Sequence, residues 1–312
     1  MAKTKRKKSA YRNKTLWGII LAVLAAAALY LLNRYDLLDV KTWEKMLGGG
    51  SRAAAEGELQ VHFIDVGQGD CSLIVSGDRA VLIDTGEKEN GEKIVRYLKE
   101  HDIPDIDCML LTHPHSDHMG SAYYVIKNYD VGQVIIPRVK EELTPTAVFY
   151  ERFLKAIKQK GLSITAAKPG IKIDAGDGEL ELVSPVKDYD DLNNYSAAAI
   201  LTHGENSFMF TGDLEKESEK DILDAGYLRD IDVLKVGHHG SHTSSSKEFL
   251  NAVKPDYGVI MCGAGNSYGH PHKDALNRIK KYTDKIYRTD LDGTVVFTSD
   301  KDGLTVDTEK QE

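Results

Sequence analysis

Four potential metal ligands lie within six residues of this sequence. They are His113, His115, Asp117 and His118. Three imidazoles and a carboxylate suit zinc, with manganese or iron as alternatives. Histidine and aspartate rarely gather at the end of an apolar stretch unless something compensates the loss of their hydration. The cluster therefore predicts a metal site rather than a loop that is rich in histidine by chance.

The segments around the cluster indicate how it is positioned. An apolar run over 106–111 leads into it and a helical pattern over 119–128 follows, which predicts a loop between a buried strand and a helix. Further predicted strands cover 59–65, 71–75, 80–84, 133–136, 179–183, 197–202, 207–211, 232–236, 257–262, 285–287 and 294–298, and further predicted helices cover 91–100, 146–160, 215–224, 246–253 and 273–282. This alternation predicts a layered α/β sandwich, with sheets inside and helices outside.

The first part of the chain differs from the rest in composition. Residues 1–56 contain 11 Lys and Arg against 4 Asp and Glu, whereas the remainder contains 29 against 44. The apolar run over 16–32 has 17 residues, the lower limit for a helix that crosses a bilayer. We therefore predict a basic cytoplasmic tail over 1–15, a transmembrane helix over 16–32, a linker over 33–57 and one large domain over 58–312.

The basic tail also predicts an orientation. Positive residues stay on the cytoplasmic side, so the large domain of a single-pass protein at the cell membrane would lie outside the cell. A cleaved signal peptide is the alternative, because residues 25–28 are all alanine. The apolar run continues to Leu32 without a polar break, which favours an uncleaved anchor. The sequence indicates no obligate protein partner.

The chain has three cysteines. Cys71, Cys108 and Cys262 all lie in apolar, strand-like surroundings. Buried free thiols are the expected state, rather than a disulfide with one cysteine left over.

Five further motifs accompany the histidine cluster in a fixed order. They are FIDVGQGD at 63–70, LIDTG at 82–86, FTGD at 210–213, LKVGHHGS at 234–241 and NSYGHP at 266–271. Together they resemble the metallo-β-lactamase superfamily, and more narrowly the soluble hydrolase domain of ComEC-type competence proteins. The resemblance covers roughly residues 60–298 and implies an αββα fold.

The resemblance also implies a dinuclear site for two divalent metal ions, with zinc as the first candidate and manganese as the second. The implied ligands are His113 and His115 for one ion, Asp117 and His118 for the other, and Asp213 as the bridge between them. His238 is the expected further ligand of the second ion, with His239 as the alternative. A water shared by two such ions ionises near neutral pH, so metal-bound hydroxide would be the nucleophile.

Other residues of the motifs receive supporting roles from the same resemblance. Asp117 and Asp84 are the implied catalytic carboxylates, and Asp84 would act by orienting a ligand imidazole. Asp65 and Asp70 would support the site from the turn over 63–70. The implied substrate-binding residues are His239, Asn193, Ser196 and His270.

One departure from the wider superfamily concerns the first metal. Many members supply another histidine to it from the segment between the cluster and the bridging aspartate. His203 is the single histidine between residues 118 and 213. It lies just before a predicted turn, so we expect a residue of a surface turn rather than a ligand.

The predicted function is metal-dependent hydrolysis, with a phosphodiester or nucleic acid as the first candidate substrate. The alternatives are an envelope substrate, such as a choline-phosphate ester or a β-lactam, and a catalytically silent metal-binding surface module. Beyond residue 56 the net charge is −15, which does not provide the basic field for strong polyanion binding. Lys235, Lys247 and Lys273 are the candidates for a local basic rim.

Overall fold

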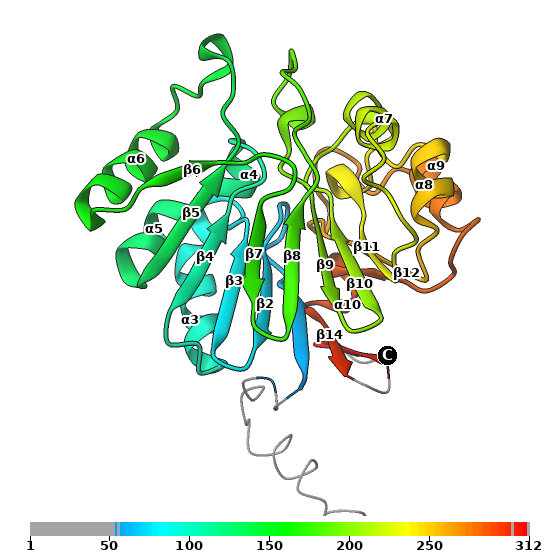
Figure 1. Ribbon diagram of the computed structural model, residues 1–312, viewed down its shortest axis with the longest axis horizontal. Coiled ribbons are helices and arrows are strands. Elements are labelled where there is room, and N and C mark those ends of the chain that lie inside the picture. The colour runs from blue at the N-terminus through cyan, green and yellow to red at the C-terminus, as the bar shows by residue number, and fades with distance from the viewer. Residues whose placement is uncertain (1–53, 55–56, 301–302, 311–312) are drawn as a thin grey trace, which may run out of the picture. The chain divides into compact units, whose positions relative to one another are not determined.

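The computed structural model describes residue 54, residues 57–300 and residues 303–310. In this part of the chain two β-sheets lie face to face, and helices cover their outer faces (Figure 1). The first sheet has the order β15 (Gly303–Thr308), β14 (Val295–Asp300), β1 (Leu59–Phe63), β2 (Ser72–Ser76), β3 (Arg79–Ile83), β4 (Ile106–Leu110), β5 (Val131–Ile136) and β6 (Ile164–Ala166). The second has the order β13 (Ile286–Arg288), β12 (Tyr257–Ile260), β11 (Val233–Lys235), β10 (Asn206–Phe210), β9 (Ala199–His203), β8 (Gly178–Leu182) and β7 (Lys172–Ala175). This is the αββα sandwich that the sequence predicts.

Three apolar layers hold the sandwich together. Between the sheets, Phe63 and Leu110 of the first pack with Phe208 of the second. Beneath the outer helices, Ile94 belongs to the layer on the first sheet and Phe249 to the layer on the second. The helices are α3 (Gly91–Glu100), α5 (Ala122–Asn128) and α6 (Val148–Lys160) on one side, and α7 (Lys216–Asp224), α8 (Lys247–Val253) and α9 (Lys273–Ile279) on the other. Strands with buried side chains on both faces explain the nearly continuous apolar runs of the sequence.

Parallel strands place the sequence motifs with candidate ligands at one edge of the sandwich. In the first sheet β3, β4 and β5 are parallel, and in the second sheet β10, β11, β12 and β13 are parallel. Each motif with a candidate ligand follows the carboxyl end of such a strand: 112–118 after β4, 211–213 after β10 and 236–239 after β11. The carboxyl ends of parallel strands are where open α/β folds bind ligands.

The structure departs from the predicted elements at two places. Three strands were not predicted, namely β6, β7 and β15, and all three are short or partly exposed segments at or near a sheet edge. The predicted helix over 119–128 is instead two helices, α4 (Ser116–Met119) and α5, which meet at Gly120. A Cβ on Gly120 would lie 2.6 Å from the backbone nitrogen of Lys88, so the chain needs glycine where these segments pack.

Two further predictions concern the cysteines and the amino-terminal segment. Cys71, Cys108 and Cys262 are buried and free, as predicted. Burial raises the pKa of each thiol, to about 12 for Cys108 and Cys262. The predicted tail over 1–15 and transmembrane helix over 16–32 lie outside the described residues and stay predictions. Among the helices that the structure does describe, none combines the length and apolar character needed to cross a membrane.

Candidate metal centre

A buried carboxylate ties together the segments that carry the histidine cluster. Asp84, just after β3, accepts hydrogen bonds from the backbone N–H and the hydroxyl of Thr112, both at 2.7 Å. Its Oδ2 also lies 2.8 Å from Nδ1 of His118 in α4. Asp84 is fully buried and has a positive φ of 60°, which aspartate tolerates better than most residues. It therefore holds the His118 ring in place without lining the pocket beside the site, and its role toward a bound metal stays a prediction.

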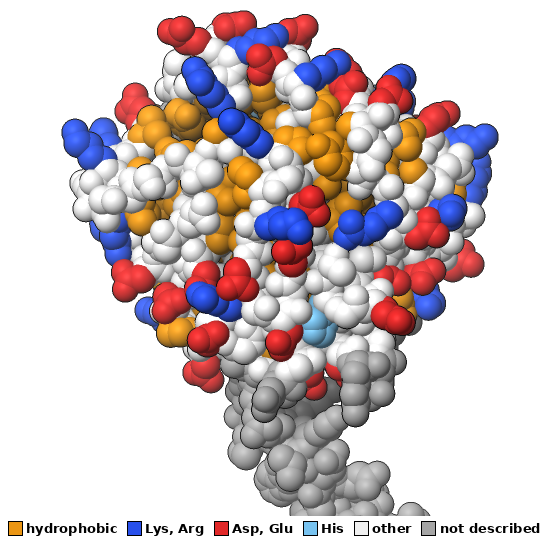
Figure 2. All heavy atoms as spheres, viewed as in Figure 1, with side chains coloured by type: hydrophobic (Ala, Val, Ile, Leu, Met, Phe, Trp, Pro, Cys, Tyr) orange, Lys and Arg blue, Asp and Glu red, His pale blue; other side chains and the backbone are white. Residues whose placement is uncertain are grey.

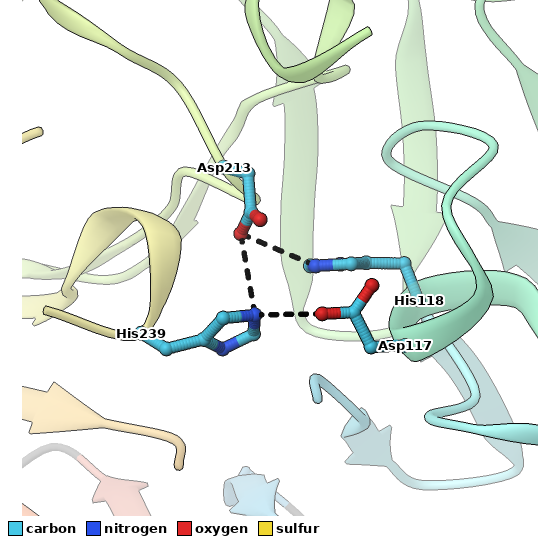
Figure 3. Close-up of side chains that lie close together, drawn as sticks. All are labelled: Asp117, His118, Asp213 and His239. Carbon is cyan, nitrogen blue, oxygen red and sulfur yellow. Dashed lines mark ion pairs between the residues drawn. The ribbon is translucent and has the colours of Figure 1, made fainter. Parts of the chain in front are cut away.

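Four side chains from three segments converge beside that ring (Figure 3). Asp117 and His118 belong to α4, Asp213 follows β10, and His239 lies in the turn η4 (Gly237–Gly240). One ligand atom from each lies within 4.8 Å of the others. Nε2 of His118 is 3.2 Å from Oδ1 of Asp213, and Nε2 of His239 is 3.3 Å from Oδ2 of Asp117 and 3.7 Å from Oδ1 of Asp213.

Three atoms at the centre of this group have no hydrogen-bond partner although they are buried. They are Nε2 of His118, Nε2 of His239 and Oδ1 of Asp213. Buried polar atoms are almost always satisfied, so three orphaned atoms that face one another require an explanation. A divalent cation supplies one, because imidazole nitrogens and carboxylate oxygens are the ligands that zinc and manganese take. These residues fit a metal ion.

The other oxygen of Asp213 faces a second group of imidazoles. Oδ2 lies 3.6 Å from Nε2 of His238 and 4.0 Å from Nε2 of His113. Nε2 of His113 is in turn 2.9 Å from Nδ1 of His115. On its far side, Nδ1 of His113 lies 3.3 Å from the hydroxyl of Ser196, which also accepts the backbone N–H of Asp213 at 3.0 Å. The Asp213 carboxylate thus separates two sets of candidate ligands.

The adjacent histidines of η4 differ in their surroundings. Both have left-handed backbone angles, with φ of 51° for His238 and 53° for His239. His239 is buried and its Nδ1 donates to the carbonyl of Met261 at 2.9 Å. His238 is partly exposed and its Nδ1 lies 3.3 Å from Oε1 of Glu215. His238 was the expected ligand of the second metal and His239 the alternative, and the structure places His239 in the four-residue group.

Electrostatics distinguishes the two groups of histidines. Burial lowers the pKa of His118, but the carboxylates of Asp213, Asp84 and Asp117 outweigh it and hold that pKa well above its usual range. For His239 the same balance, dominated by Asp213 and Asp70, gives a pKa of about 9. Burial prevails at His113, whose pKa is lowered well below normal. Without a cation, the positive charge of protonated His118 and His239 offsets the negative charge of the buried carboxylates. A bound metal ion would supply that positive charge in place of the protons.

A buried lysine supports the site from behind. Lys235 of β11 is 2% exposed, pairs with Asp70 and donates to the carbonyl of Gly212 at 3.2 Å. Oδ1 of Asp70 lies 3.3 Å from Nδ1 of His239. The expectation that Lys235 belongs to a basic rim is therefore wrong. A lysine within an apolar strand was the available signal, since such a lysine needs a buried carboxylate.

The pocket beside these ligands has a volume of about 270 Å³. Its lining residues are Gln68, His115, Ser116, Asp117, Asn193, Asp213, His238, His239, Tyr268 and His270. The predicted substrate-binding residues Asn193, His239 and His270 are among them, whereas Gln68, Ser116 and Tyr268 were not predicted. The fourth, Ser196, is fully buried behind His113 and does not line the pocket.

Two remaining candidates lie apart from the ligands. Oδ1 of Asp65 accepts the backbone N–H of Gly67 at 2.9 Å, so this carboxylate shapes the turn over 63–70. His203 is buried rather than at the surface, and its Nδ1 lies 2.7 Å from the hydroxyl of Ser299. In the antiparallel β9–β10 hairpin, His203 lies opposite Asn206 at the turn end. The other end, where Ala199 lies opposite Phe210, is the one that leads to the site. The expectation of a surface residue is corrected, because a polar partner allows the ring to be buried.

Comparisons with known proteins agree with this geometry. Residues 64–264 match the family described as the metallo-beta-lactamase superfamily. The chain belongs to that superfamily, and its αββα sandwich and ligand cluster are those of a metal-dependent hydrolase.

The more specific likeness is to competence proteins. The chain is 33% identical over 265 residues to ComE operon protein 3 of Bacillus subtilis (strain 168), covering 78% of this chain and 33% of that protein. It is 31% identical over 292 residues to competence protein ComA of Neisseria gonorrhoeae, covering 91% of this chain and 39% of that protein. The chain therefore spans little more than a third of the length of these relatives. Among solved structures, Igni18, a metallo hydrolase from Ignicoccus hospitalis, has a TM-score of 0.50 at 17% identity, covering 76% of this chain and 98% of that one, and shows the same fold.

Proposed function

We propose that this protein is a two-metal phosphodiesterase whose substrate class is nucleic acid. The observation that carries the proposal is the position of Asp213 between two sets of ligands. A carboxylate whose two oxygens face different sets of imidazoles can bridge two cations. Paired cations of this kind recur in phosphatases and nucleases, where they act on both the attacking and the leaving oxygen of a displacement.

The two sets assign the ligands. On the Oδ1 side of Asp213, the candidates are Asp117, His118 and His239. On the Oδ2 side they are His113, His115 and His238. His238 would thereby take the place of the additional ligand histidine, since His203, the single histidine between residues 118 and 213, pairs with Ser299 instead. This mixture of nitrogen and oxygen ligands favours zinc or manganese over calcium or magnesium.

Each protein group then has a definite task. Bound cations would acidify a shared water and polarise the phosphoryl oxygens. Asp84 holds the ring of His118, and the Lys235–Asp70 pair faces Nδ1 of His239. Glu215 lies beside Nδ1 of His238, and this contact lowers the pKa of the glutamate. These contacts fix the ligand rings before a cation binds, which lessens the cost of ordering them.

One observation favours nucleic acid, and a second indicates that its binding need not be tight. The relatives named above are competence proteins. On the face shown in Figure 2, basic and acidic side chains are interspersed over the described residues. Such a face provides no continuous basic surface, so recognition would depend on the pocket rather than on a general attraction to phosphates.

The test is hydrolysis by the full chain loaded with zinc or with manganese. Bis(p-nitrophenyl) phosphate, single-stranded DNA and a chromogenic cephalosporin separate the substrate classes. We expect cleavage of the first two, loss of cleavage with a chelator, and no turnover of the cephalosporin. Turnover of the cephalosporin alone would contradict the proposal, and so would phosphodiester cleavage that is retained by Asp213→Ala.

A further inference from the structure

One aromatic side chain at the rim of the pocket is not needed for packing. Tyr268 is 63% exposed, although it lines the pocket beside the candidate ligands. Its ring stacks on that of His270, with centroids 5.6 Å apart and an interplanar angle of 17°. The His270 ring is 5.5 Å from that of His238. The outer face of Tyr268 therefore stays open to solvent within about 11 Å of a candidate ligand.

The loop that carries Tyr268 is held in place by its own hydrogen bonds. The side-chain Nδ2 of Asn266 donates to the backbone carbonyls of Gly263 and His270, at 2.9 and 2.6 Å. Its Oδ1 accepts the backbone N–H of His270 at 2.9 Å. One asparagine side chain thus closes the loop around Tyr268. A ring that is ordered in advance loses little entropy when a ligand stacks on it.

The same loop orients a second side chain of the pocket. Oε1 of Gln68 accepts the backbone N–H of Gly263 at 3.1 Å, which fixes which end of the amide carries the hydrogens. Its Nε2 is buried, has no hydrogen-bond partner and belongs to a residue that lines the pocket. A buried donor without a partner loses free energy that a bound acceptor would restore. Phosphate oxygens are acceptors of this kind.

We infer that Tyr268 and Gln68 form a nucleotide subsite, in which a nucleobase stacks on the Tyr268 ring and a phosphate oxygen accepts from the Gln68 amide. The inference rests on the proposed function and specifies its substrate. A base has a π-face whatever its identity, so an exposed tyrosine recognises nucleic acid without selecting a sequence. The arrangement also distinguishes a nucleotide from a phosphodiester without a ring, which has nothing to place on Tyr268.

The test compares two substrates in the full, metal-loaded chain. One is a short single-stranded oligonucleotide, and the other is the same oligonucleotide with abasic sites. We expect Tyr268→Ala to lower kcat/KM about tenfold on the first. On the abasic substrate, Tyr268→Ala should lower kcat/KM by no more than about twofold. Tyr268→Phe, which keeps an aromatic ring, should cleave the normal oligonucleotide as well as the unmodified chain does. Gln68→Leu should raise KM on both substrates alike. Leu291→Ala, at an exposed apolar residue that does not line the pocket, is the control.

A binding measurement separates failure of the subsite from failure of the proposed function. Titration calorimetry of the metal-loaded chain with AMP and with ribose 5-phosphate requires no turnover. The subsite predicts tighter binding of AMP, and Tyr268→Ala should remove that preference. Equal binding of the two ligands, or an equal loss on both oligonucleotides, would overturn the subsite. If AMP is preferred but no phosphodiester is cleaved, the proposed function fails and the subsite stands.

Discussion

Two groups of buried histidines in this protein have opposite electrostatic character. In the first sheet, His62 of β1 is 1% exposed and packs against the rings of Tyr97 and His101. Its Nδ1 lies 2.8 Å from the Tyr97 hydroxyl and its Nε2 lies 3.2 Å from Oε1 of Gln60. Both ring nitrogens have neutral partners, so the His62 group is complete as it stands.

At the metal centre, rings that are equally buried are incomplete. Nε2 of His118 and Nε2 of His239 lack hydrogen-bond partners and face carboxylates. Burial lowers the pKa of His62 to about 3, helped by His101, whereas carboxylates raise the pKa of His239 to about 9. Burial alone therefore does not identify a metal ligand. The candidate ligands differ from His62 in having orphaned nitrogens that face carboxylates.

The largest expected effect comes from removing the carboxylate shared by both ligand sets. Asp213→Ala should reduce the metal content from two ions to less than one. The phosphodiesterase activity should fall at least about a thousandfold, because paired cations contribute several kcal/mol to transition-state stabilisation. Elemental analysis and kcat measure the two quantities. His62→Gln, at an equally buried histidine, is the matched control and should keep both ions. Loss of metal from His62→Gln would contradict the claim that only the histidines near Asp213 hold metal ions.

The next effect distinguishes the two adjacent histidines. His239→Ala should weaken binding of one ion more than about a hundredfold, because it removes a candidate ligand of the four-residue group. His238→Ala should weaken the other ion and leave the first in place. Zinc titration with a competing chelator resolves two binding steps. If His238→Ala affects the ion that Asp117 and His118 hold, the assignment is reversed.

A smaller effect tests the orienting carboxylate. Asp84→Asn should weaken metal binding by about 10- to 100-fold while all candidate ligands remain. Asp107→Asn provides the matched control, because that carboxylate also accepts a backbone N–H, from Ala80 at 2.8 Å, but does not contact a site histidine. Metal affinity of the control should equal that of the unmodified chain. Equal losses in both variants would show a general destabilisation rather than an orienting role.

The extent to which the fold could be predicted follows from where its strands lie. Central strands such as β4 and β10 are buried on both faces, so they appear in the sequence as apolar runs. The strands that were not predicted lie at or near sheet edges, where β7 alternates exposed and buried residues and β15 is partly exposed throughout. Their pairing depends on neighbours distant in the sequence, which a local pattern does not contain.

The candidate site divides in the same way. His113, His115, Asp117 and His118 lie within six residues of one another, so this cluster is visible in the sequence alone. The choice between His238 and His239 was not predictable, because it depends on two successive left-handed residues that are not glycine. The ion pair of Lys235 with Asp70 joins strand β11 to the turn between β1 and β2, which is distant in the sequence, so only the fold reveals it.

The smallest expected effect is a pH dependence of folding that comes from the His62 group alone. His62 has a pKa of about 3 in the folded chain and about 6.5 when unfolded. Above pH 6.5 the ring is neutral in both states and costs nothing. As the pH falls below 6.5, His62 binds a proton in the unfolded chain but stays neutral in the folded chain. The free energy of unfolding therefore decreases until about pH 3. At pH 5 the loss is about 2 kcal/mol. Urea unfolding at pH 7.5 and pH 5, with the same excess of chelator, should therefore show a smaller decrease for His62→Gln than for the unmodified chain. Equal decreases would mean that His62 takes up a proton in the folded state, as His118 and His239 do beside their carboxylates.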